Sequence, residues 1–375
     1  MLDDINLLLN NRLNRINSML FKTKRHIIIL LTGIFMTTTF LYALQNKSIE
    51  NFNETEWEEI TSSHDPALFY APHEKDGKFF NPWIARPNYG FLTMLKWRFT
   101  GKKGEYTEEE KNFLPNVKNL TAEYINTNDN FFTWLGHVSI LMKISGRVIL
   151  IDPILGDIPY VRKRWTPSAL CYEEAGLIKG DILVLLTHNH YDHLDRKSLD
   201  SLPKSKNFVV AKGLSPIIKD IPKNSIAELD WWEEIHIDNI KIVFLPSQHW
   251  SRRMMFDTNE SLWGSYLIDT GKKKIFICGD TGYSNIYREI ASKYPKIEYA
   301  FMSTGATQPR WFMRHSHQNE IEAIRGFNEL KAKYMIPIHW GAFVLGDEPV
   351  GCPAVRMKKN FPGAMIMDCG EIINF

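Results

Sequence analysis

The chain has little excess charge of either sign, few cysteines, and no internal repeat or low-complexity tract. Its 45 basic and 43 acidic residues leave a net charge of +2, which argues against a nucleic-acid-binding protein because such proteins need a strongly basic surface. The 4 cysteines show no C-x-x-C spacing, so they predict no disulfide framework and leave the redox compartment open. With 375 residues, 44% of them hydrophobic, the chain can form one large domain or two ordinary ones.

One long hydrophobic run lies near the amino terminus. His26 to Leu44 contains no Asp, Glu, Lys or Arg, and a helix of this length can cross a bilayer. Basic residues precede the run and acidic residues follow it, so the positive-inside rule predicts a single-pass anchor with a cytoplasmic amino terminus and a non-cytoplasmic (periplasmic or luminal) catalytic domain. No Ala-x-Ala cleavage site is evident, which favours an uncleaved transmembrane helix over a signal peptide. A buried core helix and a membrane-surface helix are the alternatives.

Residues 1–25 and 45–127 flank this run. An apolar stripe at helical spacing along 2–20 predicts that 1–25 form a basic amphipathic lead-in on the cytoplasmic side, or a helix that contacts a partner. Residues 45–127 have few clean periods and are interpreted as a linker and an extension packed on the main domain, which spans 128–375. The aromatic segment Phe79 to Trp83 favours a structural brace over a lipid-docking surface.

The densest group of metal-ligand side chains follows a short apolar run. Ile182 to Leu186 has no helical period and is short enough for a buried strand, so the next residues lie on the turn that leaves it. There the sequence places three imidazoles and a carboxylate within six positions, at His188, His190, Asp192 and His193. Alternate residues of an extended segment point the same way, so His188 and His190 can bind one ion together. This cluster predicts a zinc-type site, and surface histidines on a polar loop are the alternative.

Other short apolar runs resemble this one. The sequence predicts strands at Phe131 to Leu135, Val138 to Lys143, Arg147 to Ile151, Phe208 to Ala211, Ile240 to Leu245, Lys274 to Cys278 and Tyr334 to Ile338. Three of them lead into His249, Asp280 and His339, and chance does not readily place a ligand-type residue after each strand. Asp152 ends an earlier run, where it is either a ligand or a residue that shapes the turn before a proline. An amphipathic helix is predicted at 318–331.

Several of these segments resemble a known family. The segment His188-Asn189-His190-Tyr191-Asp192-His193 matches the HxHxDH motif of the metallo-β-lactamase superfamily. Further segments resemble the N-acyl phosphatidylethanolamine phospholipase D family, namely Thr133-Trp134-Leu135-Gly136-His137, Glu228-Leu229-Asp230-Trp231-Trp232-Glu233-Glu234, Pro246-Ser247-Gln248-His249-Trp250, Leu262-Trp263-Gly264-Ser265, Gly279-Asp280-Thr281-Gly282-Tyr283, Pro309-Arg310-Trp311-Phe312-Met313 and Ile338-His339-Trp340-Gly341. The resemblance covers about Asn81 to Pro349. It implies an α/β protein, an αββα sandwich with metals at one edge of two sheets.

The resemblance also implies two zinc ions with a shared ligand. Their ligands would be His188, His190 and His249 for one ion, Asp192, His193 and His339 for the other, and Asp280 between them. A hydroxide shared by the two ions would attack phosphorus in a phosphodiester, with Asp192 and Asp280 essential to the chemistry as ligands. Iron or manganese can also occupy sites of this nitrogen and oxygen composition.

Three residues in or near the matched segments are predicted to act on the substrate. His317 resembles a family histidine and would position or protonate the leaving group. Arg253 would bind phosphate, with a solvated charge or a structural salt bridge as the alternative. Trp340 is predicted to contact the substrate. The segment Thr304 to Gln308 departs from the family pattern, which leaves acyl-chain and headgroup specificity open.

Three further polar residues are assigned outside the ligand set. His137 is interpreted as an outer contact of the metal site at most. A metal-bound histidine needs an acceptor on its other nitrogen, and Asp195 or a backbone carbonyl is predicted to supply it. His315 is predicted to cap a helix or lie on the surface.

Together these features predict a membrane-anchored metallohydrolase with two Zn²⁺ ions, a phosphodiesterase of phospholipase D type. Its substrate would be N-acyl phosphatidylethanolamine or a related phospholipid, with the membrane as partner and the oligomeric state open. Two alternatives remain: hydrolysis of another bond, such as a lactone or a nucleotide or sugar phosphodiester, and a non-catalytic zinc-binding membrane scaffold.

Overall fold

The computed structural model describes residues 52–87, 104–158 and 163–375, and the single residues Thr23, Ile27, Leu31, Gly33, Thr38, Tyr89, Thr93 and Trp97. Asn53–Arg86 and Lys103–Phe375 form one compact unit, and Met1–Phe52 with Pro87–Lys102 form another. Apart from the single residues, the predicted lead-in and membrane helix therefore lie outside the described residues. Within the described part of the chain, no helix combines the length and apolar character needed to cross a membrane.

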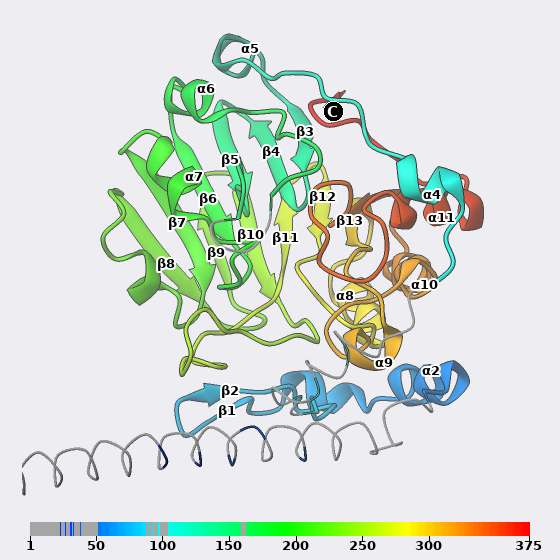
Figure 1. Cartoon of the computed structure of the whole chain (residues 1–375). Helices are drawn as coiled ribbons and strands as arrows, with labels where there is room; N and C mark the ends of the chain where they lie inside the picture. Colours follow the sequence, from blue (N-terminus) through cyan, green and yellow to red (C-terminus); the bar gives the residue numbers. More distant parts are fainter. Residues whose placement is uncertain are drawn as a thin grey trace, which may run out of the picture. The chain divides into compact units, whose positions relative to one another are not determined.

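The main unit contains two large β-sheets (Figure 1). One has the order β15-β3-β4-β5-β6-β7-β8, with strands at Ile372–Asn374 (β15), Phe131–Gly136 (β3), Ser139–Ile144 (β4), Arg147–Ile151 (β5), Ile182–Leu186 (β6), Lys206–Ala211 (β7) and Ser225–Leu229 (β8). The other has the order β14-β13-β12-β11-β10-β9, with strands at Tyr334–Ile338 (β14), Ile297–Ser303 (β13), Lys274–Ile277 (β12), Ser265–Asp269 (β11), Ile240–Leu245 (β10) and Glu234–Ile237 (β9). A two-stranded ribbon joins Glu74–Lys75 (β1) to Lys78–Phe79 (β2).

Helices lie beside each sheet (Figure 1). Those of the first half are Glu54–Ser62 (α2), Pro66–Tyr70 (η2), Glu108–Asn112 (α4), Ala122–Thr127 (α5), Tyr172–Gly176 (α6), Arg196–Ser201 (α7) and Ser215–Ile218 (η3). Those of the second half are Ile286–Lys293 (α8), Arg310–Met313 (α9), Glu320–Leu330 (α10) and Cys352–Asn360 (α11). Helices α6 and α7 lie beside β5 to β8. Helices α8, α10 and α11 lie on the side of the sheet that contains β12 to β14. The predicted αββα sandwich is therefore confirmed for the described residues.

The two sheets pack face to face through one hydrophobic core. Phe132 of β3 contacts Tyr299 and Phe301 of β13 at ring-centroid distances of 5.0 and 5.3 Å. Tyr266 of β11 donates its hydroxyl to the carbonyl oxygens of Leu186 (2.9 Å) and Val209 (3.1 Å), which lie in the other sheet. Because this buried hydroxyl is hydrogen-bonded, it can lie in the core without an unsatisfied polar group. Its hydrogen bonds also fix the two sheets in register.

The aromatic part of the extension packs against the sandwich, as predicted for a structural brace. Phe79 and Trp83 are 4% and 6% exposed and belong to the core, so these aromatic side chains are buried against the main unit. Asn81 donates to the carbonyl oxygen of His249 (2.9 Å), and Trp83 Nε1 donates to Gln248 Oε1 (3.2 Å). The extension thus supports the backbone beside one of the predicted metal ligands.

Candidate metal centre

The predicted ligands meet because the strands that deliver them end at a common edge. Strands β5, β6 and β7 are parallel, as are β12, β13 and β14, while β10 and β12 are both antiparallel to β11. The carboxyl ends of β6, β10, β12 and β14 are followed by His188, His249, Asp280 and His339. Open α/β sheets characteristically bind ligands outside the carboxyl ends of their strands.

Three imidazoles form the first cluster. His188 Nε2 lies 2.9 Å from His190 Nδ1, and His249 Nε2 lies 3.2 Å from the same atom. Tetrahedral zinc with bonds of 2.0–2.1 Å separates its nitrogen ligands by ~3.4 Å, so these atoms converge as metal ligands do. With an oxygen of Asp280, all the ligand atoms of this cluster lie within 4.8 Å of one another.

Asp280 also reaches the second cluster. Its Oδ1 lies 3.1 Å from His339 Nε2, and its Oδ2 lies 3.2 Å from His193 Nε2. Asp192 Oδ2 lies 3.5 Å from His339 Nε2 and 3.7 Å from His193 Nε2. The carboxylate of Asp280 is therefore central, because its Oδ2 also lies 3.8 Å from His249 Nε2. The seven side chains predicted from the sequence are gathered in one place.

Metal ions would satisfy the buried polar atoms of this centre better than hydrogen bonds among these atoms do. Buried atoms of the centre without a hydrogen-bond partner include His193 Nε2, His339 Nε2 and Asp280 Oδ1. Buried polar groups in folded proteins are almost always paired, so such a concentration of unpaired atoms calls for a ligand. An imidazole-rich set with carboxylates suits a borderline metal such as zinc.

Protonation of the first cluster also suits a metal. Burial lowers the pKa of His190 to about 3 and holds the pKa values of His188 and His249 well below the usual value. These imidazoles are neutral near pH 7, which is the form that binds metal.

In the second cluster, burial alone would lower the pKa of His339, but Asp280 and Asp192 outweigh burial and raise the pKa to about 9. A metal that binds there must displace a proton.

Asp152 turns out to be the carboxylate that orients a predicted ligand. Its Oδ2 accepts hydrogen bonds from His193 Nδ1 (2.7 Å) and Thr187 Oγ1 (2.5 Å), and its Oδ1 accepts from the Thr187 N–H (2.8 Å). The sequence suggested Asp195 for this task, and that prediction is wrong. Asp195 instead caps α7 by accepting from the N–H groups of Lys197 and Ser198. The other suggested acceptor, a backbone carbonyl, serves His249, whose Nδ1 lies 2.9 Å from the Ser316 oxygen.

We expect Asp152→Asn to weaken metal binding by about 10- to 100-fold. An asparagine has one acceptor oxygen, so it cannot accept from both the Thr187 N–H and His193 Nδ1 as Asp152 does. The His193 ring would then lose the hydrogen bond that fixes the tautomer with its Nε2 lone pair toward a metal. Titration of Zn²⁺ against a competing chelator measures the change. Asp195→Ala is the control, since removing a helix cap should cost about 0.5–2 kcal/mol of stability without changing the affinity. Equal affinities in Asp152→Asn and the unmodified protein would contradict this role.

His137 lies closer to the centre than predicted. Its Nε2 is 3.1 Å from Asp192 Oδ2, and it groups with Asp192, His193 and His339 in a set that could hold an ion. His137, Asp152 and His339 all have left-handed backbone conformations, with φ values of 58°, 41° and 66°. Such conformations are unfavourable for non-glycine residues and cluster at functional sites.

A glycine permits the close approach of the two sheets at this edge. A Cβ atom at Gly279 would lie 2.3 Å from the Gly264 carbonyl oxygen and 3.1 Å from Thr187 Cβ. Only glycine fits between these groups, and it brings the following Asp280 against the turn that carries His188.

The residues predicted to act on the substrate have different surroundings. His317 is half-buried, with its Nδ1 3.8 Å from Asp280 Oδ2, and desolvation lowers its pKa to about 4. Arg253 donates from NH1 to the carbonyl oxygens of Asn189 (3.1 Å) and Leu194 (2.8 Å), so it fixes the motif loop, and phosphate binding by it stays a prediction.

Two residues assigned near the site are buried in the structure. Trp340 is 2% exposed, stacks on Trp134 at 5.0 Å and donates to the Pro337 carbonyl oxygen, and its contact with a substrate stays a prediction. For His315 the prediction is wrong. His315 is neither a helix cap nor exposed. It is 7% exposed and packs edge-on against Trp57 at 4.6 Å.

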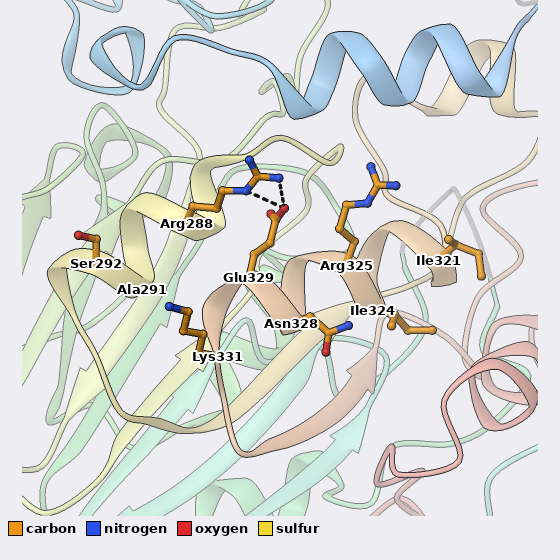
Figure 2. A pocket seen from close by; sticks show the side chains of 9 residues that line it. All are labelled: Arg288, Ala291, Ser292, Ile321, Ile324, Arg325, Asn328, Glu329 and Lys331. Atoms are coloured by element: carbon orange, nitrogen blue, oxygen red, sulfur yellow. Dashed lines mark hydrogen bonds and ion pairs between the residues drawn. The ribbon is translucent and has the colours of Figure 1, made fainter.

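Two cavities differ in their relation to the centre. One of about 440 Å³ opens beside His249, and its lining comprises Phe80, Asn81, Pro82, Ile84, Ala85, Arg86, His249, Trp250, Asn259 and Trp263. Another of about 800 Å³ lies between α8 and α10, where Arg288 pairs with Glu329 (Figure 2). None of the predicted ligands lines the second cavity, whereas His249 lines the first and His339 lines a smaller one of about 10 Å³.

Several known proteins are similar to this chain in sequence. A family profile described as "Beta-lactamase superfamily domain" matches residues 147–340. The chain is 30% identical over 304 residues to "N-acyl-phosphatidylethanolamine-hydrolyzing phospholipase D 1" of Caenorhabditis elegans, a match that covers 74% of this chain and 84% of that protein. It is 32% identical over 228 residues to "N-acyl-phosphatidylethanolamine-hydrolyzing phospholipase D, mitochondrial" of Saccharomyces cerevisiae, covering 58% of this chain but only 48% of that protein.

A solved structure supports the fold independently. Igni18, a metallo hydrolase from the archaeon Ignicoccus hospitalis, matches with a TM-score of 0.51 and 19% sequence identity. The match covers 65% of this chain and 97% of that chain. At this identity the likeness concerns the fold alone.

Proposed function

Since the chain belongs to the metallo-β-lactamase superfamily, in its N-acyl phosphatidylethanolamine phospholipase D-like family, and is a metal-dependent hydrolase, we propose that it is a phosphodiesterase of phospholipase D type. Its substrate would be N-acyl phosphatidylethanolamine or a related phospholipid. The observation that carries the proposal is Asp280, whose carboxylate contacts histidines of both clusters. This arrangement suits two metal ions with a shared ligand.

Two Zn²⁺ ions are proposed as the cofactors. His188, His190 and His249 would hold one ion and Asp192, His193 and His339 the other. When bound, such a pair supplies a water of lowered pKa and neutralises the oxygens of a phosphodiester. The surrounding residues hold the ligands in place: Asp152 fixes the ring of His193, and the Ser316 carbonyl fixes the ring of His249.

His317 is proposed to position the leaving group. With a pKa of about 4 the imidazole is neutral near pH 7, so it can accept a proton or a hydrogen bond more readily than it can protonate an alkoxide. Its Nδ1 has no partner and lies near Asp280. The ring is therefore available to a group bound between the clusters.

The proposal includes a membrane tether. The apolar, uncharged run 26–44, with basic residues before it and acidic residues after it, supports a single-pass anchor. The same charge bias supports a catalytic domain on the non-cytoplasmic side. An anchor of this kind would keep the metal centre close to a phospholipid substrate.

The proposed activity can be tested on the full-length protein in detergent. After loading with Zn²⁺, the protein should release phosphatidic acid and an N-acylethanolamine from N-acyl phosphatidylethanolamine, as measured by mass spectrometry. Phosphatidylcholine and phosphatidylethanolamine serve as comparison lipids, and a lactone and a sugar phosphodiester test the other hydrolase chemistries. If no glycerophospholipid is cleaved while one of these other compounds is, the phospholipase proposal fails.

A further inference from the structure

Three consecutive large apolar side chains project from the loop that follows His249. Met254, Met255 and Phe256 are 66%, 80% and 83% exposed, more than any other large apolar side chain in the described part of the chain. Single exposed apolar residues are ordinary on protein surfaces, whereas contiguous ones mark a site of interaction. We refer to these three residues as the apolar tip.

The base of this loop is held by a set of hydrogen bonds. The Asn259 N–H donates to the Ser251 carbonyl oxygen (2.8 Å), and the Ser251 N–H donates to Asn259 Oδ1 (3.2 Å). Asp257 Oδ1 accepts from the N–H groups of Arg253 (3.0 Å) and Met254 (2.8 Å). A closed turn of this kind directs the apolar tip outward, away from the core of the described unit.

The loop is also joined to the metal centre. The two bonds from Arg253 NH1 to carbonyl oxygens end on Asn189 and Leu194, on either side of the motif ligands His190, Asp192 and His193. The ring of Trp250, which begins the loop, packs edge-on against His190 at 4.7 Å. Whatever covers the apolar tip is therefore held next to the centre.

Cationic and aromatic groups gather around Trp250, at the start of the same loop. The guanidinium carbons of Arg86 and Arg252 lie 3.8 and 5.3 Å from the centroid of the Trp250 ring. Phe80, which is 40% exposed, lines the adjoining cavity together with Trp250. Apolar side chains at the tip with tryptophan and arginine behind them match the layers of a bilayer surface, where acyl chains lie beneath anionic headgroups.

From these observations we propose that the apolar tip inserts into a phospholipid bilayer and holds the mouth of the metal centre against it. This inference rests on the proposed function, because a lipid substrate would then pass from the bilayer to the cavity beside His249. The basic and aromatic groups behind the tip favour a lipid surface over a second copy of this chain or another protein.

Insertion can be measured without turnover, in the full-length protein reconstituted into phosphatidylcholine and phosphatidylglycerol vesicles. Cys171 is the exposed cysteine of the described residues and is replaced by serine, and an environment-sensitive fluorophore is attached through Met255→Cys. The matched control carries the fluorophore through Leu177→Cys, at a leucine that is 61% exposed. We expect a blue shift and quenching by nitroxide-labelled acyl chains for the label at position 255 and neither for the label at position 177.

The same measurement can overturn the proposal. No shift at position 255, or equal quenching at both positions, would exclude insertion of the apolar tip. A shift at position 255 that depends on protein concentration in detergent, without vesicles, would assign the tip to a contact between copies of the chain. None of these readings depends on the hydrolytic activity, so failure of the proposed function is distinguishable from failure of this inference.

A kinetic comparison separates docking from catalysis. The variant Met254→Ser/Met255→Ser/Phe256→Ser should lower kcat/KM for substrate in vesicles by about tenfold, because three apolar side chains no longer enter the bilayer. Its kcat/KM for a short-chain monomeric phospholipid should stay unchanged, and Leu177→Ser should change neither value. Equal losses on both substrates would mean that the loop supports the fold, and would overturn the proposal.

Discussion

Replacing Asp280 by asparagine should lower kcat for the proposed substrate by at least about a thousandfold, well beyond the 10- to 100-fold effect typical of a residue that only orients a metal ligand. Burial alone would raise the pKa of this carboxyl, but His193, His339 and His317 outweigh it and hold the pKa well below its usual value. The native group is therefore a carboxylate at the pH of the assay. An asparagine carries no charge and has one acceptor oxygen, so it cannot serve both clusters.

The measurements for Asp280→Asn are turnover, metal content per chain and the thermal transition. We expect low turnover and a reduced metal content, with circular dichroism like that of the unmodified protein. Asp269→Asn is the control, because Asp269 is an aspartate at the end of β11 that is not a predicted ligand and accepts from the Gly271 N–H at 2.9 Å. If Asp280→Asn retains full metal content and normal turnover, a shared ligand is excluded.

Much of the sandwich is predictable because buried strands leave a strong signal. Strands β5, β6, β10 and β14 lie where short, mostly apolar runs predicted them, with the same bounds in each case. A strand covered on both faces must be apolar throughout, so its end is marked by the first polar residue. At this edge a predicted ligand follows each strand end within one to four residues, which is why one pattern predicted both.

Edge strands and short helices are less predictable. Strand β8, at Ser225–Leu229, is exposed or half-buried at four of its five positions, so it lacks the apolar run that reveals a central strand. In the extension, α4 and α5 are 5 and 6 residues long, too short for a clear helical period. Their signals are local caps, Thr107 with Glu110 in a capping box for α4 and Thr121 for α5.

The outer contacts of the centre depend on tertiary packing. Asp152 and Asp195 are both aspartates near the motif, and the sequence alone does not show which of them faces His193. The choice follows from the pairing of β5 beside β6, which brings the carboxyl end of β5 next to Thr187. Trp340 directly follows a predicted ligand, yet its ring turns into the core because stacking on Trp134 and Phe113 is available there.

Removing the metal should abolish activity and lower the thermal transition of the whole domain. The unpaired atoms of the centre lie on the ends of strands from both sheets, so the bound ions would join β6, β10, β12 and β14. A ligand present at about a thousand times its dissociation constant stabilises the native state by about 4 kcal/mol. For a domain of this size that corresponds to a shift in Tm of about 10 °C.

The experiment is dialysis against a chelator, followed by measurement of metal content, hydrolysis and Tm. Adding back Zn²⁺ should restore activity and Tm together, with two ions bound per chain. Mg²⁺ should restore neither, because imidazole nitrogen is a poor ligand for a hard cation that prefers oxygen. A metal-free protein with unchanged Tm and full hydrolysis would mean that the buried histidines and Asp280 are satisfied without a metal.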